Sequence, residues 1–107
     1  MLEKNNKMYK VEWDFEALKS LEEIAEKFGE ETEISIKERV ENHLASHPYQ
    51  NGIPMKGKLE GLWRYRCLDK FRVIYEILED KIVIEILDAG HREENFYEKF
   101  KEFWNKK

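Results

Sequence analysis

The chain has 107 residues, of which 41% are hydrophobic and 39% are charged. This balance predicts one folded domain with a modest core and excludes a disordered chain. The single cysteine, Cys67, excludes an internal disulfide and a cysteine-rich metal site, and it favours a reducing, cytoplasmic location. No apolar run approaches the ~20 residues of a membrane span, and the N-terminus shows no signal-peptide pattern.

Charge is distributed unevenly along the chain. The net charge is −4, which alone argues against nucleic-acid binding. From Glu12 to Glu41 there are eleven acidic and four basic residues, whereas from Lys56 to Arg72 there are six basic and two acidic residues. This asymmetry predicts a local electropositive patch on an otherwise acidic protein.

The first half of the chain predicts one strand and two helices. Residues 1–7 are expected to form a loose polar lead, and the alternation in 9–13 is typical of a short strand. Apolar residues at helical spacing then predict helices over 15–28 and 34–47, with Gly29 ending the first. Two antiparallel helices joined by a short turn should result.

The second half predicts a hairpin-rich sheet and a final helix. Residues 48–61 contain both prolines and three of the five glycines, which is typical of a loop. Strands are predicted over 62–68, 71–78 and 82–87, where Val, Ile and aromatic residues are dense. A helical pattern returns over 93–104.

The predicted element order is therefore β-α-α-β-β-β-α, in a single domain over residues 8–107. This order indicates an α+β fold with a mainly antiparallel four-stranded sheet. A helical hairpin should pack on one face of the sheet, followed by a C-terminal helix.

Strand alternation predicts where the arginines of the central hairpin point. If the aromatic face of the hairpin meets the helices, Arg64, Arg66 and Arg72 should converge on the uncovered face of the sheet. The sequence leaves the role of these arginines open. Guanidinium groups suit phosphate, but they could equally pair with carboxylates of the same sheet. The candidate carboxylates are those of Glu76, Glu85 and Asp88. The alternate residues should form core: Trp63, Tyr65, Cys67, Phe71 and Tyr75.

Three segments carry a resemblance to a known family. They are KGKLEGLWRYRCLDKFRVIYEI (56–77), IVIEIL (82–87) and AGHREENFY (89–97). In this order they resemble the RelE/ParE toxin superfamily of type II toxin–antitoxin systems, in particular its RelE-like branch of mRNA interferases. The resemblance spans roughly residues 9–100 and implies a RelE-like fold.

The RelE branch implies a toxin that cleaves mRNA in the ribosomal A site. The 2′-hydroxyl of the substrate attacks the adjacent phosphate, so neither a metal nor another cofactor is implied. The implied partners are mRNA on the ribosome and a cognate antitoxin protein, with no membrane. Two alternatives stay open: a ParE-like inhibitor of DNA gyrase, and a member with weak or lost catalysis that acts through protein binding.

The resemblance also assigns roles to individual residues. Arg72 would hold the scissile phosphate, Arg92 would stabilise developing charge, and Tyr97 would stack on a base or assist proton transfer. His91 is the only residue in the matched motifs with a suitable unperturbed pKa for acid–base catalysis, although a structural hydrogen-bonding role is equally open. Further RNA contacts are expected from basic residues of the matched region: Arg64, Arg66, Lys56 and Lys58.

Overall fold

The computed structural model describes residues 8–105, so the predicted lead over 1–7 lies outside the described residues. One five-stranded sheet has the order β1-β5-β4-β3-β2. Only β1 and β5 are parallel; the other pairs are antiparallel. The strands are β1 Lys10–Trp13, β2 Ile53–Pro54, β3 Trp63–Cys67, β4 Phe71–Leu78 and β5 Val83–His91.

The predicted α+β class is confirmed, with one strand more than expected. The extra strand, β2, has only two residues and pairs with Trp63 and Arg64 of β3. It lies in the segment predicted as a loop, which also contains the short helix α3 Pro48–Asn51. A two-residue strand that holds a proline has no alternation pattern to detect.

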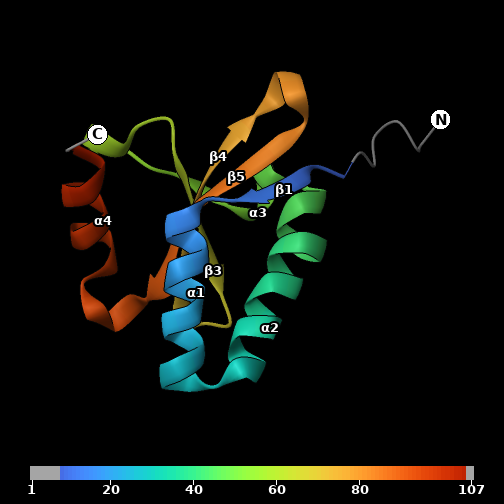
Figure 1. Cartoon of the computed structure of the whole chain (residues 1–107). Helices are drawn as coiled ribbons and strands as arrows, with labels where there is room; N and C mark the ends of the chain where they lie inside the picture. Colours follow the sequence, from blue (N-terminus) through green and yellow to red (C-terminus); the bar gives the residue numbers. More distant parts are fainter. Residues whose placement is uncertain (1–7, 106–107) are drawn as a thin grey trace.

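Two helices form the predicted hairpin on one face of the sheet (Figure 1). Helix α1, Phe15–Phe28, buries one residue per turn along a single stripe: Ala17, Leu21 and Ile24. Gly29 has φ 103°, a conformation that favours glycine, and it links α1 directly to α2, Glu30–Glu38.

The continuation of α2 departs from a regular α-helix. A π-helical turn, Arg39–His43, follows α2 and leads into a 3-10 turn, Leu44–Ser46. The buried residues Ile36, Val40 and Leu44 recur every four residues, slightly more than the α-helical period. A wider π turn keeps such residues on one face, so the local geometry follows the apolar spacing.

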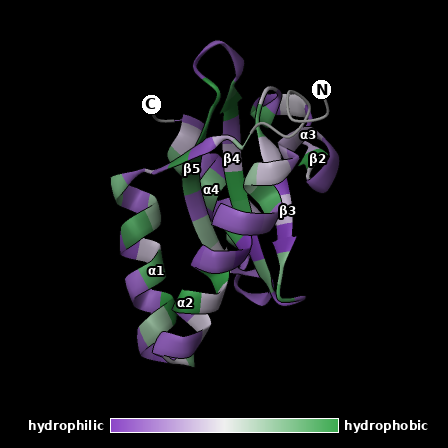
Figure 2. Cartoon of the chain, turned by 90° about the vertical axis from the view of Figure 1, so that its right-hand side faces the viewer, coloured by the Kyte–Doolittle hydropathy of each residue, from purple (hydrophilic) through white to green (hydrophobic). Residues whose placement is uncertain are grey.

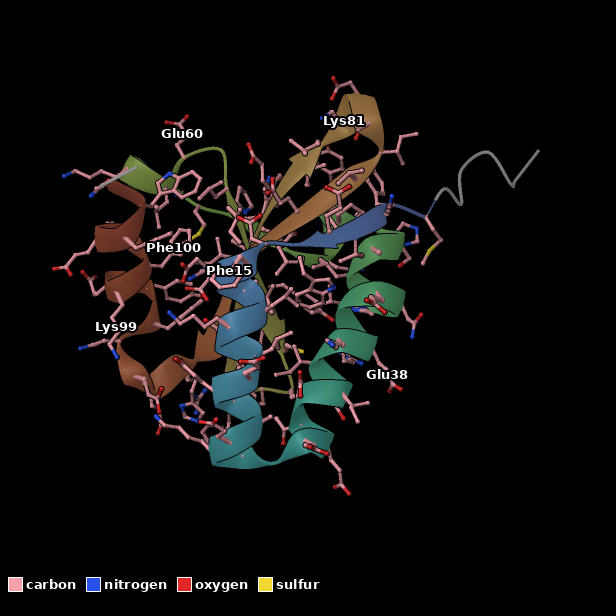
Figure 3. The ribbon with its side chains drawn as sticks, viewed as in Figure 1. Phe15, Glu38, Glu60, Lys81, Lys99 and Phe100 are labelled. Atoms are coloured by element: carbon pink, nitrogen blue, oxygen red, sulfur yellow. The ribbon has the colours of Figure 1, made fainter. Side chains whose placement is uncertain are left out.

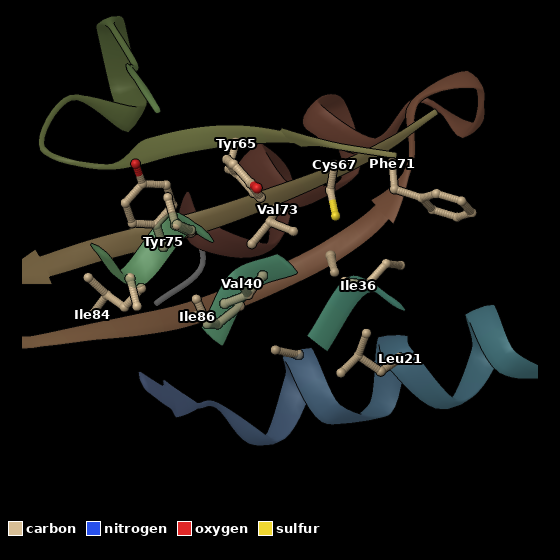
Figure 4. Packing of buried hydrophobic residues seen from close by; sticks show 14 of the residues in the cluster. Leu21, Ile36, Val40, Tyr65, Cys67, Phe71, Val73, Tyr75, Ile84 and Ile86 are labelled. Carbon is tan, nitrogen blue, oxygen red and sulfur yellow. The ribbon is translucent and has the colours of Figure 1, made fainter. Parts of the chain in front are cut away.

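The main core fills the space between this helical hairpin and the sheet (Figure 4). Leu21, Ile36 and Val40 meet Tyr65, Cys67, Phe71, Val73 and Tyr75 there, as strand alternation predicts. Cys67 is buried, which confirms the prediction, and this burial raises the pKa of its thiol to about 11. Colouring by hydropathy shows that β4 is largely hydrophobic along its length (Figure 2).

Helix α4, Phe96–Asn105, packs on the opposite face of the sheet. Its Phe96 and Phe100 bury Ile74 and Leu87, so the expectation that the arginine face is uncovered was wrong. The helix begins later than predicted because Arg92–Glu94 form a 3-10 turn and Asn95 is left-handed, with φ 56°. Figure 3 shows Phe100 on the sheet side of α4 and Lys99 on its outer side.

Strand β5 runs four residues beyond its predicted end at Leu87 and contains an irregularity. Ile74 pairs with Asp88 while Tyr75 pairs with Ile86, so Leu87 is an extra residue in the ladder. Leu87 packs under α4, and Asp88 accepts a 2.6 Å hydrogen bond from Ser20 of α1. The bulge thus turns Asp88 toward α1.

Over residues 8–105, every helix is too short or too polar to cross a bilayer.

Candidate functional site

The register of β3 and β4 gathers three arginines at one end of the sheet face that carries α4. Arg66 lies directly opposite Arg72, and Arg64 lies opposite Ile74. Directly opposed residues place their Cβ atoms about 5 Å apart, so Arg66 and Arg72 form a like-charge pair that destabilises the sheet. We call Arg64, Arg66 and Arg72 the arginine cluster. Its predicted convergence is confirmed.

Arg72 is held in place by its own hairpin. Its Nη1 donates to the carbonyl oxygens of Asp69, at 2.7 Å, and Phe71, at 3.0 Å. The turn that presents the first carbonyl contains two left-handed residues, Leu68 and Asp69, with φ 50° and 65°. No described residue accepts a hydrogen bond from Nε or Nη2 of Arg72. These donors form an oriented edge that an anion could bind.

The arginine cluster makes no salt bridge to any carboxylate of the described residues. Asp88 is bound instead by Ser20 and by the backbone N–H of Ala89. Glu85 hydrogen-bonds Asp14, and that bond, with burial and neighbouring carboxylates, raises the pKa of Glu85 to about 7. The expectation that Glu76, Glu85 or Asp88 would neutralise the arginines therefore finds no support. Uncompensated cations on one face are a feature of anion-binding sites.

Tyr97 of α4 lies beside the arginine cluster. The Arg64 Cζ is 5.8 Å from the centroid of the Tyr97 ring, within cation–π range. The Tyr97 hydroxyl is buried and has no hydrogen-bond partner among the described residues. Burial raises the pKa of Tyr97, although the nearby arginines act in the opposite direction. The hydroxyl thus keeps its proton at neutral pH, which makes it a hydrogen-bond donor.

His91 does not join the arginine cluster. It pairs with Phe71 across the β4–β5 ladder and therefore points to the face opposite Arg72. Its ring stacks on Phe28 of α1 at 5.1 Å and meets Phe71 edge-on at 5.3 Å. Its Nδ1 accepts from the backbone N–H of Glu93. These contacts are those of a structural histidine, the alternative left open by the sequence.

The remaining predicted site residues lie on other segments than the arginine cluster. The backbone N–H of Arg92 donates to the carbonyl of Lys70, which ties the end of β5 to the β3–β4 turn. The Arg92 side chain is 41% exposed, with Glu93 at 3.9 Å. Lys56 and Lys58 are exposed on a loop whose Leu59 packs beneath α4.

An acidic cluster occupies the other end of the same face, and the sequence did not reveal it. Parallel pairing of β1 with β5 places Glu12 beside Glu85, and antiparallel pairing places Glu76 on the other side of Glu85. Ile74, buried under α4, separates Glu76 from Arg72 along β4. The face is therefore basic at one end and acidic at the other. The β1–β5 pairing joins distant segments, so no local pattern predicts it.

No three His, Cys, Asp or Glu side chains of residues 8–105 are arranged to hold a metal ion.

The family model of the ParE toxin of the type II toxin–antitoxin system parDE matches residues 11–96. The chain belongs to this family. It is thus a toxin of the RelE/ParE superfamily, and the predicted superfamily is confirmed. No curated protein matches the sequence.

Solved structures show the same fold at low sequence identity. The toxin shares 22% identity with a chain of the RelBE2 toxin–antitoxin complex from Mycobacterium tuberculosis, with a TM-score of 0.70 over 79% of this chain and 92% of that one. A YoeB/ParE toxin from Agrobacterium tumefaciens gives 18% identity and a TM-score of 0.62, covering 77% and 96%. A mutant of the E. coli toxin RelE in the free state shares 19% identity, with a TM-score of 0.61 over 85% of this chain and 92% of that one. These likenesses establish the RelE-like fold.

Proposed function

We propose that the toxin cleaves mRNA, on the ribosome, with the arginine cluster and Tyr97 as its active site. The supporting observation is the uncompensated arginine cluster beside a buried hydroxyl that lacks a partner in the described residues. A buried polar group without a partner is costly, so its presence beside three cations is consistent with a ligand that completes it.

The reaction would be an intramolecular transesterification. The 2′-hydroxyl of the substrate gives its proton to a solvent water or hydroxide, and its oxygen attacks the adjacent phosphorus. The bond from phosphorus to the 5′-oxygen breaks, and the 5′-oxygen takes a proton from the Tyr97 hydroxyl or from water. The products are a 2′,3′-cyclic phosphate and a 5′-hydroxyl. Negative charge that develops on the nonbridging oxygens would be met by Arg72 and Arg66, which folding has already positioned.

Tyr97 would act on the leaving group or a nonbridging oxygen, and Arg64 on a neighbouring phosphate. Since the Tyr97 hydroxyl keeps its proton, it could donate to the departing 5′-oxygen or to a nonbridging oxygen, but it could not act as a base. Arg64, exposed beside the ring, would bind a neighbouring phosphate. Lys56, Lys58 and Arg92 would extend the basic surface around this centre.

We further propose that the toxin acts in the cytoplasm and is held by a cognate antitoxin. The basis is its family and the solved relative from Mycobacterium tuberculosis, which is a toxin–antitoxin complex.

The test is primer extension on a reporter mRNA in a translating extract. Arg72→Gln should lower cleavage by about 100-fold, because it removes one preorganised charge from the transition state. Lys19→Gln, on the exposed side of α1, makes the same change in charge and should cleave like the wild type. A synthetic RNA with a 2′-deoxy sugar at the cut position should resist cleavage. Cleavage of this RNA at the modified position would overturn the proposed chemistry.

The family model favours a second candidate function, inhibition of DNA gyrase by a ParE-like toxin. In that case the arginine cluster would contact a protein or DNA surface and would break no bond. A supercoiling assay with purified gyrase separates this candidate from the first.

A further inference from the structure

A polar cavity lies on the sheet face opposite the arginine cluster, between the continuation of α2 and the β3–β4 turn. It has a volume of about 330 Å³ and is lined by Ser35, Glu38, Arg39, Asn42, His43 and Leu68. Figure 3 shows Glu38 on the outer side of α2, which marks one wall. None of these residues takes part in the proposed active site.

The π turn Arg39–His43 builds one side of this cavity. Within it, the Nδ1 of His43 lies 2.7 Å from the hydroxyl oxygen of Tyr65, a residue that is only 2% exposed. Burial raises the pKa of Tyr65, although Arg39 acts in the opposite direction, so the hydroxyl keeps its proton and can donate to Nδ1. In the tautomer that accepts from Tyr65 at Nδ1, the ring N–H of His43 is on Nε2 and can donate to a ligand. π turns often occur at functional sites.

The side chains around the cavity are mainly hydrogen-bond donors. Arg39 is exposed and forms no salt bridge with any described residue, while Nε2 of His43 can donate in the tautomer that accepts from Tyr65. Ser35 adds a hydroxyl and Asn42 an amide, and Glu38 is the one acidic residue of the lining. A guanidinium fork with neutral N–H and O–H donors suits a phosphate, which accepts several hydrogen bonds and carries negative charge.

The free edge of β3 connects this cavity to the arginine cluster. Strand β2 pairs with Trp63 and Arg64, and within residues 8–105 no strand pairs with the outer edge of β3 from Tyr65 to Cys67. Along this edge Arg66, a member of the arginine cluster, points to one face of the sheet, while Tyr65 points to the other face, toward His43. Leu68, in the cavity wall, is two residues beyond Arg66, at most about 7 Å along the chain.

We propose that this cavity binds a backbone phosphate of the single-stranded RNA whose cleaved linkage lies on the arginine cluster. The RNA would bend around the free edge of β3 and contact both faces of the sheet. This inference rests on the proposed function, which supplies the RNA. It adds Arg39 and His43 as binding residues remote from the chemistry.

The test is fluorescence anisotropy with a labelled, fully 2′-O-methylated RNA of about twelve nucleotides, which binds without being cleaved. Arg39→Gln should weaken binding about 5-fold and reduce the slope of log K against log salt by about 0.7, the value for one phosphate on a single strand. The matched control is Lys37→Gln, because Lys37 lies on the same helix but pairs with Glu33. This variant should bind like the wild type.

A measurement on the wild-type protein avoids the possibility that a variant binds weakly because it is misfolded. The ring resonances of His43 in the wild-type protein should shift on addition of the same RNA, since the phosphate would meet Nε2–H. Wild-type affinity of Arg39→Gln, an equal loss in Lys37→Gln, or an unmoved His43 signal would each overturn the cavity as an RNA site.

The outcomes also separate this inference from the proposed function. If Arg72→Gln abolishes cleavage while Arg39→Gln binds RNA normally, only the cavity proposal fails. If Arg39→Gln weakens RNA binding but the toxin cleaves no RNA, the cavity stands and the proposed cleavage fails. If the wild type binds no RNA, the cavity proposal fails, and cleavage of the translated reporter mRNA alone decides the proposed function.

Discussion

Removal of the Tyr97 hydroxyl should lower RNA cleavage without lowering the stability of the fold. Its buried hydroxyl has no hydrogen-bond partner among residues 8–105, so folding carries the cost of removing it from water. Tyr97→Phe should therefore leave the free energy of unfolding unchanged or raise it by up to about 1 kcal/mol. The same change should lower RNA cleavage about 10- to 100-fold, because a donor to the reacting phosphate is lost.

Urea unfolding and primer extension, run on the same preparation, check this divergence. Full cleavage by Tyr97→Phe would remove the hydroxyl from the mechanism. A loss of more than 1 kcal/mol in stability would mean that the hydroxyl has a structural partner.

Single residues also mark how far the sequence could predict the site. Alternation placed Arg64, Arg66 and Arg72 on one face correctly, because side-chain direction follows from strand parity alone. The same rule could not place His91 while β5 was expected to end at Leu87. Because β5 continues, with a bulge, His91 faces Phe28 and lies away from the arginines. The bulge has no local signal in the sequence.

Among the elements, α4 is the part that completes the active site. It brings Tyr97 to Arg64, and it is held by Phe100, which is only 1% exposed. Phe100→Ala should cost about 3–5 kcal/mol in unfolding free energy, as expected for an aromatic core residue. Cleavage should fall as well, because Tyr97 loses its fixed position.

Phe103→Ala is the matched control on the same helix, since that ring is 37% exposed. Its cost should be less than half of that for Phe100→Ala. Equal costs, measured by urea unfolding, would show that α4 is not anchored through Phe100.

The acidic end of the sheet should give the toxin a pH-dependent stability. The pKa of Glu85 is raised to about 7 from an ordinary value of 4.5. Between these values the folded protein holds more protons than the unfolded chain, so stability falls as pH rises through this window. The effect should be about 1 kcal/mol, since Glu85 is partly exposed to water, which screens the interaction.

Glu85→Gln keeps a hydrogen-bonding group toward Asp14 without the charge. At pH 8 this variant should be more stable than the wild type by about 1 kcal/mol, and at pH 4 the difference should vanish. Glu22→Gln, on the exposed side of α1, should follow the wild type at both pH values. Urea unfolding at the two pH values checks this. A Glu85→Gln variant that is less stable at pH 8 would contradict the assigned cause.

The elements themselves were largely predictable, and their non-local pairing was not. Period-2 and helical patterns predicted four of the five strands, the helical hairpin and the C-terminal helix. Parallel pairing of β1 with β5 and the packing of α4 on the arginine face depend on contacts between distant segments. The π turn was also hidden, because Ile36, Val40 and Leu44 fit a continuous helix almost as well.

At the scale of the whole molecule, charge is separated rather than balanced. The net charge is −4, yet one sheet face has a basic end formed by Arg64, Arg66 and Arg72 and an acidic end around Glu85. Such a molecule would approach a polyanion in one orientation only, with the basic end leading and the acidic end repelled. Net charge alone is therefore a poor guide to what this toxin binds.

The central claim is that the arginine cluster cleaves RNA and does not merely bind a protein. The most direct measurement runs the same purified toxin in two assays: primer extension on a translated reporter mRNA, and supercoiling of DNA by gyrase. The account predicts new mRNA ends that disappear in Arg72→Gln, and gyrase activity that the toxin leaves unchanged. Intact mRNA together with inhibited gyrase would contradict it and would establish the ParE-like alternative.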